Sequence, residues 1–193
     1  SSTTTIEMSQ DRNITAVFEQ NSYMVSTSVL PVNNAEISGA GSYLHGSTAT
    51  LSVTAISPGF IFKSWAGDAT GSDNPITITV NEDVNITANL EQISLELNVT
   101  AGPGGTVTGG GQILYGSLSA IVATPSNGYS FVGWTGEGVT ETSAPSTTVN
   151  MTQARSVIAN FTLQNFTISG SITPDGKGQI SGLGDYDYGQ TAT

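Results

Sequence analysis

Apolar and polar residues alternate along most of this chain. In segments 49–55, 76–80 and 84–90 an apolar side chain occupies every second position, and threonine, serine or asparagine stands between. Such alternation is typical of β-strands that bury one face and leave the other in water. No stretch shows the 3.6-residue period of an amphipathic helix. The pattern therefore predicts an all-β fold.

Turn-forming residues separate the predicted strands. Clusters of glycine, proline, asparagine and aspartate recur roughly every ten residues. They lie at 58–59, 71–75, 81–83, 102–105 and 125–128. We expect them to divide each structural unit into about six short strands.

The sequence repeats itself at intervals of about 70 residues. Segment 59–68, which contains glycine, aromatic residues, tryptophan and an acidic residue, recurs at 128–137, and both tryptophans of the chain lie in these two copies. A glycine-flanked front segment recurs at 39–47, 109–117 and 182–190. A tandem array of small β modules is the expected architecture.

The matches between copies divide the chain into four parts. We predict the C-terminal part of one repeat at 1–20, full repeats at 21–91 and 92–163, and the N-terminal part of a following repeat at 164–193. Copies that follow one another almost without linkers should form a semi-rigid, elongated array. The partial copies predict that the repeats continue beyond this window, or that neighbouring chains complete them head to tail.

Charge and composition exclude several classes of function. The net charge is −11, from 15 acidic and 4 basic side chains, which disfavours binding to nucleic acid. The chain has no cysteine and a single histidine, so disulfides, thiolate zinc sites and most histidine-dependent catalysis are not expected. No segment approaches the roughly 18 consecutive apolar residues of a membrane helix. We expect an acidic protein that is not an enzyme, with no catalytic or cofactor-binding residues.

The two tryptophans are interpreted as core anchors. Each follows a phenylalanine by three positions, and rings of this size can fill the centre of a small unit. The glycine after each tryptophan is expected to turn the chain where a side chain would clash. The alternative is a platform on which exposed rings stack against sugars. The structural motif comprises Gly59, Phe62, Trp65, Gly67, Gly128, Phe131, Trp134 and Gly136.

Acidic residues after each tryptophan are weak candidates for a calcium site. Asp68 and Asp73 follow the first tryptophan, and Glu137 and Glu141 follow the second. Calcium prefers several carboxylate and carbonyl oxygens close together, but the dense spacing of a calcium loop is absent and the two loops differ in length. Solvated acidic loops without a metal are the default expectation.

The order of these motifs resembles the divergent branch of the internalin B-type repeat, also called the Listeria-Bacteroides repeat. The similarity covers essentially the whole chain, and the glycine–aromatic–tryptophan–glycine segment is present in both full copies. The resemblance implies a mostly-β module of about 70 residues, β-grasp-like with a short helix in the parent branch. It also implies tandem arrays in secreted and surface-attached, often adhesin-like, prokaryotic proteins, and no catalytic residues.

These features favour a structural function at the cell surface. We expect an extracellular stalk, spacer or shaft of a filament or adhesin, whose partners are neighbouring repeats of the same chain or head-to-tail copies, with cell-surface glycans as a further partner. The alternative is a carbohydrate-binding accessory module of a secreted enzyme, which saturable polysaccharide binding would distinguish. A calcium-stiffened adhesin is a third hypothesis, which chelator titration would test.

Overall fold

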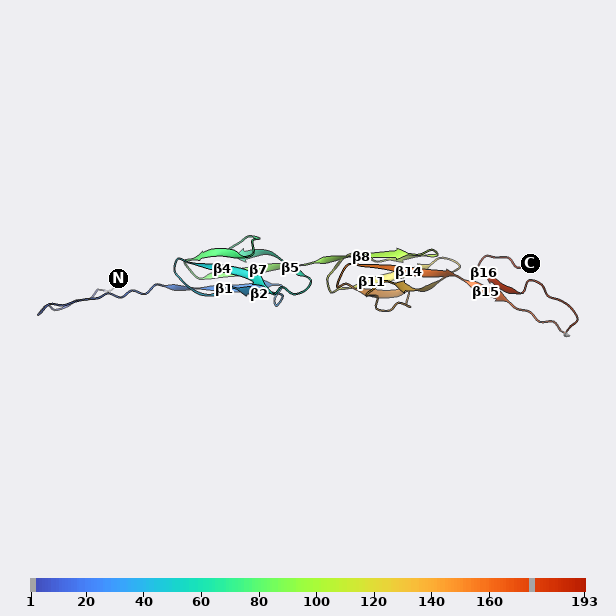
Figure 1. Ribbon diagram of the computed structural model, residues 1–193, viewed down its shortest axis with the longest axis horizontal. Coiled ribbons are helices and arrows are strands. Elements are labelled where there is room, and N and C mark those ends of the chain that lie inside the picture. The colour runs from blue at the N-terminus through green and yellow to red at the C-terminus, as the bar shows by residue number, and fades with distance from the viewer. Residues whose placement is uncertain (1–2, 174–175) are drawn as a thin grey trace. The chain divides into compact units, whose positions relative to one another are not determined.

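The computed structural model describes residues 3–173 and 176–193, and these residues form strands and loops without a helix (Figure 1). Contacts divide the chain into two compact units. The first comprises Ser1–Ser57 and Phe62–Leu90, and the second comprises Pro58–Ile61 and Glu91–Thr193. Residues 1–2 of the predicted partial repeat 1–20 and residues 174–175 of the predicted partial repeat 164–193 lie outside the described residues. No described helix is long and apolar enough to cross a membrane.

Seven strands build the first set of sheets, which belongs mainly to the first unit. A four-stranded sheet has the order β3-β1-β7-β5, and a three-stranded sheet has the order β2-β4-β6. The strands are β1 Ser22–Leu30, β2 Glu36–Ser38, β3 Gly41–Leu44, β4 Ser47–Thr54, β5 Phe60–Gly67, β6 Ile76–Val80 and β7 Val84–Gln92. The sequence predicted about six strands, because the short front segment did not separate β2 from β3.

The second unit repeats this topology. Its sheets have the orders β10-β8-β14-β12 and β13-β11-β9, and a hairpin of β15 and β16 follows. The strands are β8 Ser94–Ala101, β9 Gly105–Thr108, β10 Gly111–Leu114, β11 Leu118–Pro125, β12 Tyr129–Thr135, β13 Ser146–Asn150, β14 Arg155–Leu163, β15 Asn165–Ile168 and β16 Gly184–Asp187.

The first and last long strands of each copy lie side by side and parallel at the centre of the larger sheet. Val25 of β1 lies opposite Val84 of β7, and Leu97 of β8 lies opposite Arg155 of β14. This parallel pair makes the larger sheet of each copy a mixed sheet, and the β-grasp-like arrangement that the resemblance implied stays a prediction. The short helix of the parent branch is not found among residues 3–173 and 176–193, where small three-stranded sheets occur instead.

The two sheets of the second unit share one core. Leu97 from the four-stranded sheet and Ile121 from the three-stranded sheet are both buried in it, together with Trp134. Along β11 every second residue is buried, which is the period-two pattern predicted from the sequence. The all-β class and the tandem small sheets are therefore confirmed.

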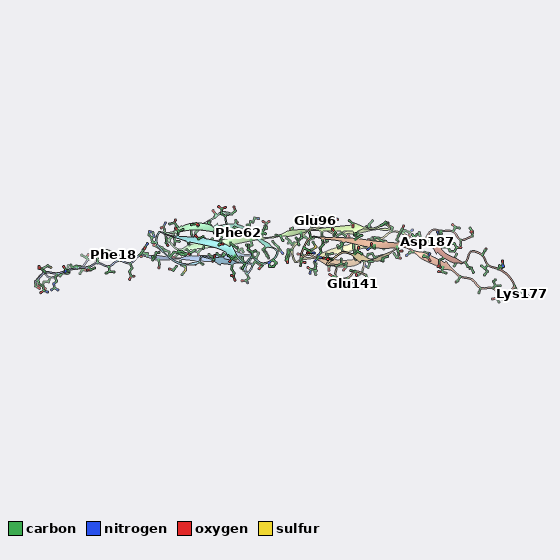
Figure 2. The ribbon with its side chains drawn as sticks, in the orientation of Figure 1. Phe18, Phe62, Glu96, Glu141, Lys177 and Asp187 are labelled. Carbon is green, nitrogen blue, oxygen red and sulfur yellow. The ribbon has the colours of Figure 1, made fainter. Side chains whose placement is uncertain are left out.

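The N-terminal segment differs from the complete copies. Residues 3–21 form no strand, and their apolar side chains, including Ile14, Val17 and Phe18, are exposed. Figure 2 shows Phe18 on this segment, outside the sheets. The equivalents of Ile14, which are Ile86 in β7 and Val157 in β14, are buried because neighbouring strands and the second sheet cover them. An alternating sequence becomes a strand only where such partners meet it.

Candidate functional site

The two tryptophans of the motif occupy equivalent places in the two units. Trp65 on β5 is 2% exposed and Trp134 on β12 is 4% exposed. The indole Nε1 of Trp65 donates to the carbonyl of Asp73 at 2.8 Å, and that of Trp134 donates to the carbonyl of Ala144 at 3.0 Å. Each indole therefore fixes the loop that follows its own strand.

Neighbouring motif residues complete this packing. The ring centroids of Phe62 and Trp65 are 5.2 Å apart, and those of Phe131 and Trp134 are 5.7 Å apart. These distances are typical of tilted and edge-to-face aromatic pairs. Gly136 has a φ of 124°, and a Cβ on it would lie 2.5 Å from the carbonyl oxygen of Ser156 on β14. Gly67 makes the equivalent approach to Asn85 on β7.

The first glycine of each motif lies against a tyrosine ring from further along the chain. A Cβ on Gly128 would lie 2.2 Å from Cδ1 of Tyr188, and a Cβ on Gly59 would lie 2.2 Å from Cδ1 of Tyr115. Pro58–Ile61 belongs to the second unit, so both contacts lie within that unit. We call each contact a glycine–tyrosine joint. Sequence reasoning missed the joints, although the shared tyrosine before Gly116 and Gly189 was a visible signal.

Backbone hydrogen bonds accompany both joints. The amide of Gln164 donates to the carbonyl of Gly128 at 2.8 Å, and the amide of Ile93 donates to the carbonyl of Gly59 at 2.8 Å. At the second joint, Nδ2 of Asn127 also donates to the hydroxyl of Tyr188 at 2.7 Å. The carbonyl of the joint glycine therefore accepts a backbone amide at both joints.

Carboxylates that were candidates for calcium lie in exposed loops. Asp68 Oδ2 accepts the amide of Asn85 at 2.7 Å, and Asp73 contributes its backbone carbonyl to Trp65. Among the described residues, no three acidic, histidine or cysteine side chains come together in a way that could hold a metal.

The two glutamates of the second unit also have local partners. Glu141 Oε1 accepts the hydroxyl of Ser143 at 2.6 Å and its amide at 3.2 Å. These two hydrogen bonds, the hydroxyl one first, lower the pKa of Glu141 below its ordinary value of 4.5. Glu137 pairs with Arg155 at 3.6 Å. These contacts stabilise loop conformations.

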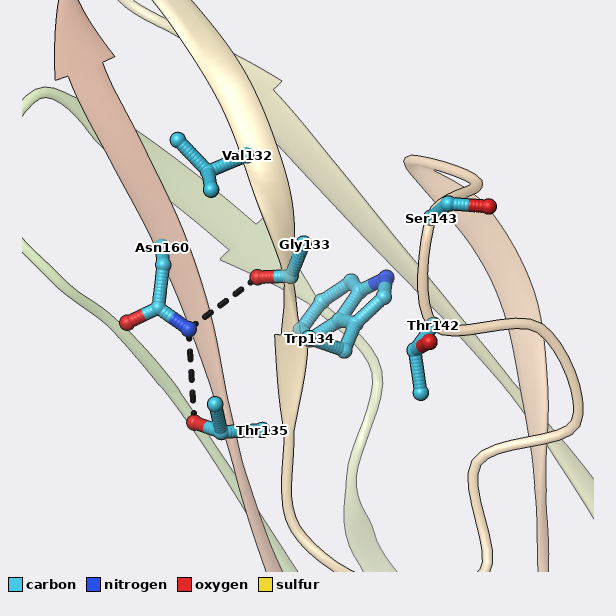
Figure 3. Close-up of a pocket in the computed structure, with 7 residues that line it drawn as sticks. All are labelled: Val132, Gly133, Trp134, Thr135, Thr142, Ser143 and Asn160. Carbon is cyan, nitrogen blue, oxygen red and sulfur yellow. Dashed lines mark hydrogen bonds between the residues drawn. The ribbon is translucent and has the colours of Figure 1, made fainter.

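A hollow of about 460 Å³ lies beside Trp134 in the second unit (Figure 3). Its wall on β12 consists of Val132, Gly133, Trp134 and Thr135. Thr142 and Ser143 line it from the following loop, and Asn160 lines it from β14. The residues that line it carry hydroxyl, amide and apolar groups and no charge.

The hollow depends on a glycine that faces an asparagine across two paired strands. Gly133 lies opposite Asn160 in the β12–β14 register, next to an irregularity at Phe131/Gly133. Asn160 Nδ2 donates to the Gly133 carbonyl at 3.1 Å and to Thr135 Oγ1 at 3.3 Å. In the first unit, Ser64 occupies the place of Gly133, and its hydroxyl accepts Nδ2 of Asn89 at 3.4 Å. Glycine removes that hydroxyl, and a Cβ at this position would lie 3.2 Å from the carbonyl oxygen of Thr142.

Comparison with protein families identifies the repeated unit. A model of the divergent InlB B-repeat domain matches the chain twice, over residues 25–94 and 95–165. The chain belongs to the divergent InlB B-repeat family. Its two repeats contain one tryptophan motif each, at equivalent places in the two sheets. No curated protein and no solved structure matches the chain significantly.

Membership of this family sets the broad class of the protein. InlB-type repeats occur in surface proteins of bacteria, and this chain is a repeat-containing module of that kind. The two InlB-type repeats share their buried motif residues, whereas the hollow beside Trp134 arises from a difference between them. Gly133 was visible in the sequence only as a departure from Ser64.

Proposed function

We propose that this chain is a non-catalytic spacer segment in the extracellular part of a bacterial surface protein. Its InlB-type repeats would hold a neighbouring functional domain at a distance from the cell, as part of a stalk or an adhesin shaft. The proposed partners are neighbouring repeats of the same chain or head-to-tail copies.

The glycine–tyrosine joint is the observation that carries this proposal. At the second joint, the Gly128 turn receives the amide of Gln164, while the carbonyl of Gln164 accepts the amide of Tyr188 at 2.8 Å. The side chain of Tyr188 then covers Gly128, where no Cβ could fit. The ring, the turn and the connecting residue restrict one another, and such contacts between neighbouring elements support a spacer of fixed geometry.

Short connections support the same role. Ile93 alone separates β7 from β8, and Gln164 alone separates β14 from β15. Both residues donate their amides to a joint glycine, so the connection itself is hydrogen-bonded. A connection of this kind differs from a flexible linker, which lacks fixed backbone partners.

Distances between spin labels test the proposal. The chain has no cysteine, so Thr50→Cys on β4 and Ala120→Cys on β11 introduce two labelling sites at exposed positions. We expect a single narrow distance distribution by pulsed electron paramagnetic resonance. Tyr115→Ala should broaden it, because the ring that covers Gly59 is lost.

Tyr188→Ala is the matched control. It removes the equivalent ring from the other joint, so the distribution between positions 50 and 120 should stay narrow. A broad distribution in the unmodified chain would reject a spacer of fixed length, and equal broadening by the two tyrosine variants would reject the role of the individual joint.

A further inference from the structure

We propose that the hollow beside Trp134 in the second repeat binds a neutral sugar ring, as a weak glycan-contact site that is separate from the spacer role. A pyranose presents one face of C–H groups and a rim of hydroxyls, each of which can donate and accept a hydrogen bond. The hollow combines an apolar wall with a rim of small polar side chains, and its volume of about 460 Å³ lies in the range of small-molecule sites.

Val132 supplies most of the apolar wall, because Trp134 also lines the hollow but is only 4% exposed. Val132 is 59% exposed although it lies in a strand, because the irregularity at Phe131/Gly133 places an additional residue on β12. Between these two side chains, Gly133 leaves only backbone. The C–H face of a sugar would lie against Val132 and this stretch of backbone.

The polar rim is made of three hydroxyls, and those of Ser143 and Thr135 take part in hydrogen bonds within the chain. Ser143 donates its hydroxyl proton to Glu141, which leaves the oxygen lone pairs of Ser143 as acceptors. Thr135 Oγ1 receives Nδ2 of Asn160. The backbone of Thr142 is fixed, because its carbonyl accepts the backbone amide of Trp134 at 2.8 Å. A rim of hydroxyls favours a ligand that offers hydroxyls in return.

Charge favours a neutral ligand over an anionic one. None of the residues that line the hollow is charged, and the chain as a whole carries −11. Sulfated or uronic-acid glycans would meet a repulsive field and would find no arginine or lysine in the hollow with which to pair.

The first repeat is an internal control for the site. The equivalents of Val132, Gly133 and Thr135 are Lys63, Ser64 and Ala66. The first repeat therefore has a charged residue in place of the apolar one, a side chain in place of the glycine, and a methyl group in place of the rim hydroxyl. Its tryptophan is similarly buried and donates an equivalent indole hydrogen bond. The two repeats therefore differ around the tryptophan in these substitutions and in the following loop, where Gly71 takes the place of Thr142 as the acceptor of the tryptophan amide.

Nuclear magnetic resonance of the full chain tests the site. The two indole Nε1–H groups give one signal for each repeat, and cellotetraose, mannotetraose and chitotetraose serve as neutral probes, with a sulfated oligosaccharide of similar length as the charged comparison. We expect saturable shifts for at least one neutral probe at Trp134, Thr142 and Ser143, and none at Trp65.

Variants that copy the first repeat assign the binding to the hollow. Gly133→Ser should weaken binding at least about tenfold without loss of the folded spectrum, because the first repeat tolerates serine at this place. Thr135→Ala provides a second, exposed variant with the same expected direction. Ser64→Gly in the first repeat is the matched control and should leave binding at Trp134 unchanged.

Three results would overturn the site. The first is that no neutral probe gives saturable shifts up to its solubility limit. The second is binding that survives both Gly133→Ser and Thr135→Ala. The third is saturation by the sulfated probe alone. Saturation by a proline-rich or leucine-rich peptide without any response to sugars would assign the hollow to a protein partner and reject the glycan. None of these results bears on the label distances that test the spacer.

Discussion

At the scale of single residues, glycines with similar backbone angles have different roles. Gly116 and Gly128 have φ values of 78° and 79°. A Cβ on Gly116 would meet nothing within 4 Å, whereas one on Gly128 would collide with Tyr188. The first position needs glycine for its backbone conformation alone, and the second also needs it for the approach of an aromatic ring.

This pair gives a prediction for glycine-to-alanine substitution. Gly116→Ala should destabilise the second repeat by about 1–2 kcal/mol, which is the strain of a left-handed L-residue. Gly128→Ala should add to that strain the displacement of Tyr188 and the loss of its hydrogen bond from Asn127. Hydrogen exchange should therefore rise in β15 and β16 for Gly128→Ala, and urea unfolding should measure the two free energies.

The double variant Gly128→Ala with Tyr188→Ala controls for the ring. Adding Gly128→Ala to the Tyr188→Ala variant should lower the free energy of unfolding by less than adding it to the unmodified chain, because the collision has been removed. Equal effects of Gly116→Ala and Gly128→Ala on β15 and β16 would contradict a joint at Gly128.

At the scale of elements, each strand that carries a tryptophan is connected to its following loop by one indole hydrogen bond. The bond reaches Asp73 in one repeat and Ala144 in the other. The acceptor is a backbone carbonyl in both cases, so the residue type there is free to differ. This explains how loops of different sequence and length follow the same strand.

We predict that substitution of either tryptophan lowers the free energy of unfolding of its repeat by a similar amount. Trp65→Phe and Trp134→Phe each remove a buried indole hydrogen bond and part of a core ring, and each should destabilise its own repeat by about 2 kcal/mol. Hydrogen exchange resolved along the chain measures the two repeats separately. Tolerance of one substitution together with unfolding by the other would show that the two tryptophans have different structural roles.

At the scale of the whole molecule, charge is the dominant global property. The chain has fifteen acidic side chains and only four basic ones. Arg155 pairs with Glu137, but most carboxylates have no cation available to them in such a composition. Repulsion between like charges should therefore oppose folding at low ionic strength.

We expect added salt to stabilise the fold. The melting temperature should rise by about 5 °C between low salt and 0.5 M NaCl, since the screening length falls well below the spacing of exposed charges. Differential scanning calorimetry measures it. Glu36→Gln with Glu82→Gln, at two exposed acidic positions, should raise the melting temperature at low salt and reduce the response. If the melting temperature of the unmodified chain stays constant or falls as salt is added, repulsion between like charges has no significant effect on its stability.

Local patterns in the sequence predicted most of the strands. Alternation in 49–55 and 84–90 identified strands β4 and β7, and the absence of a 3.6-residue period predicted that no helix would form. The family was recognisable because the motif around Trp65 recurs around Trp134. These properties are local, since which side of a strand is apolar depends only on residues two positions apart.

Contacts between distant segments could not be predicted in this way. The parallel pairing of β1 with β7, the contact between Gly128 and Tyr188, and the hollow at Gly133 all join residues far apart in sequence, or depend on the volume left between them. Residues 3–21 share the alternating pattern and yet form no strand.

The sequence by itself thus determined the all-β class, the repeated motif and the apolar face of each strand, because these follow from side-chain period and composition. Only the tertiary structure decided which strands pair, where a ring covers a glycine and where a missing side chain leaves space. Those outcomes depend on what lies opposite each residue in the folded chain, and a pattern along one strand carries no information about its neighbours.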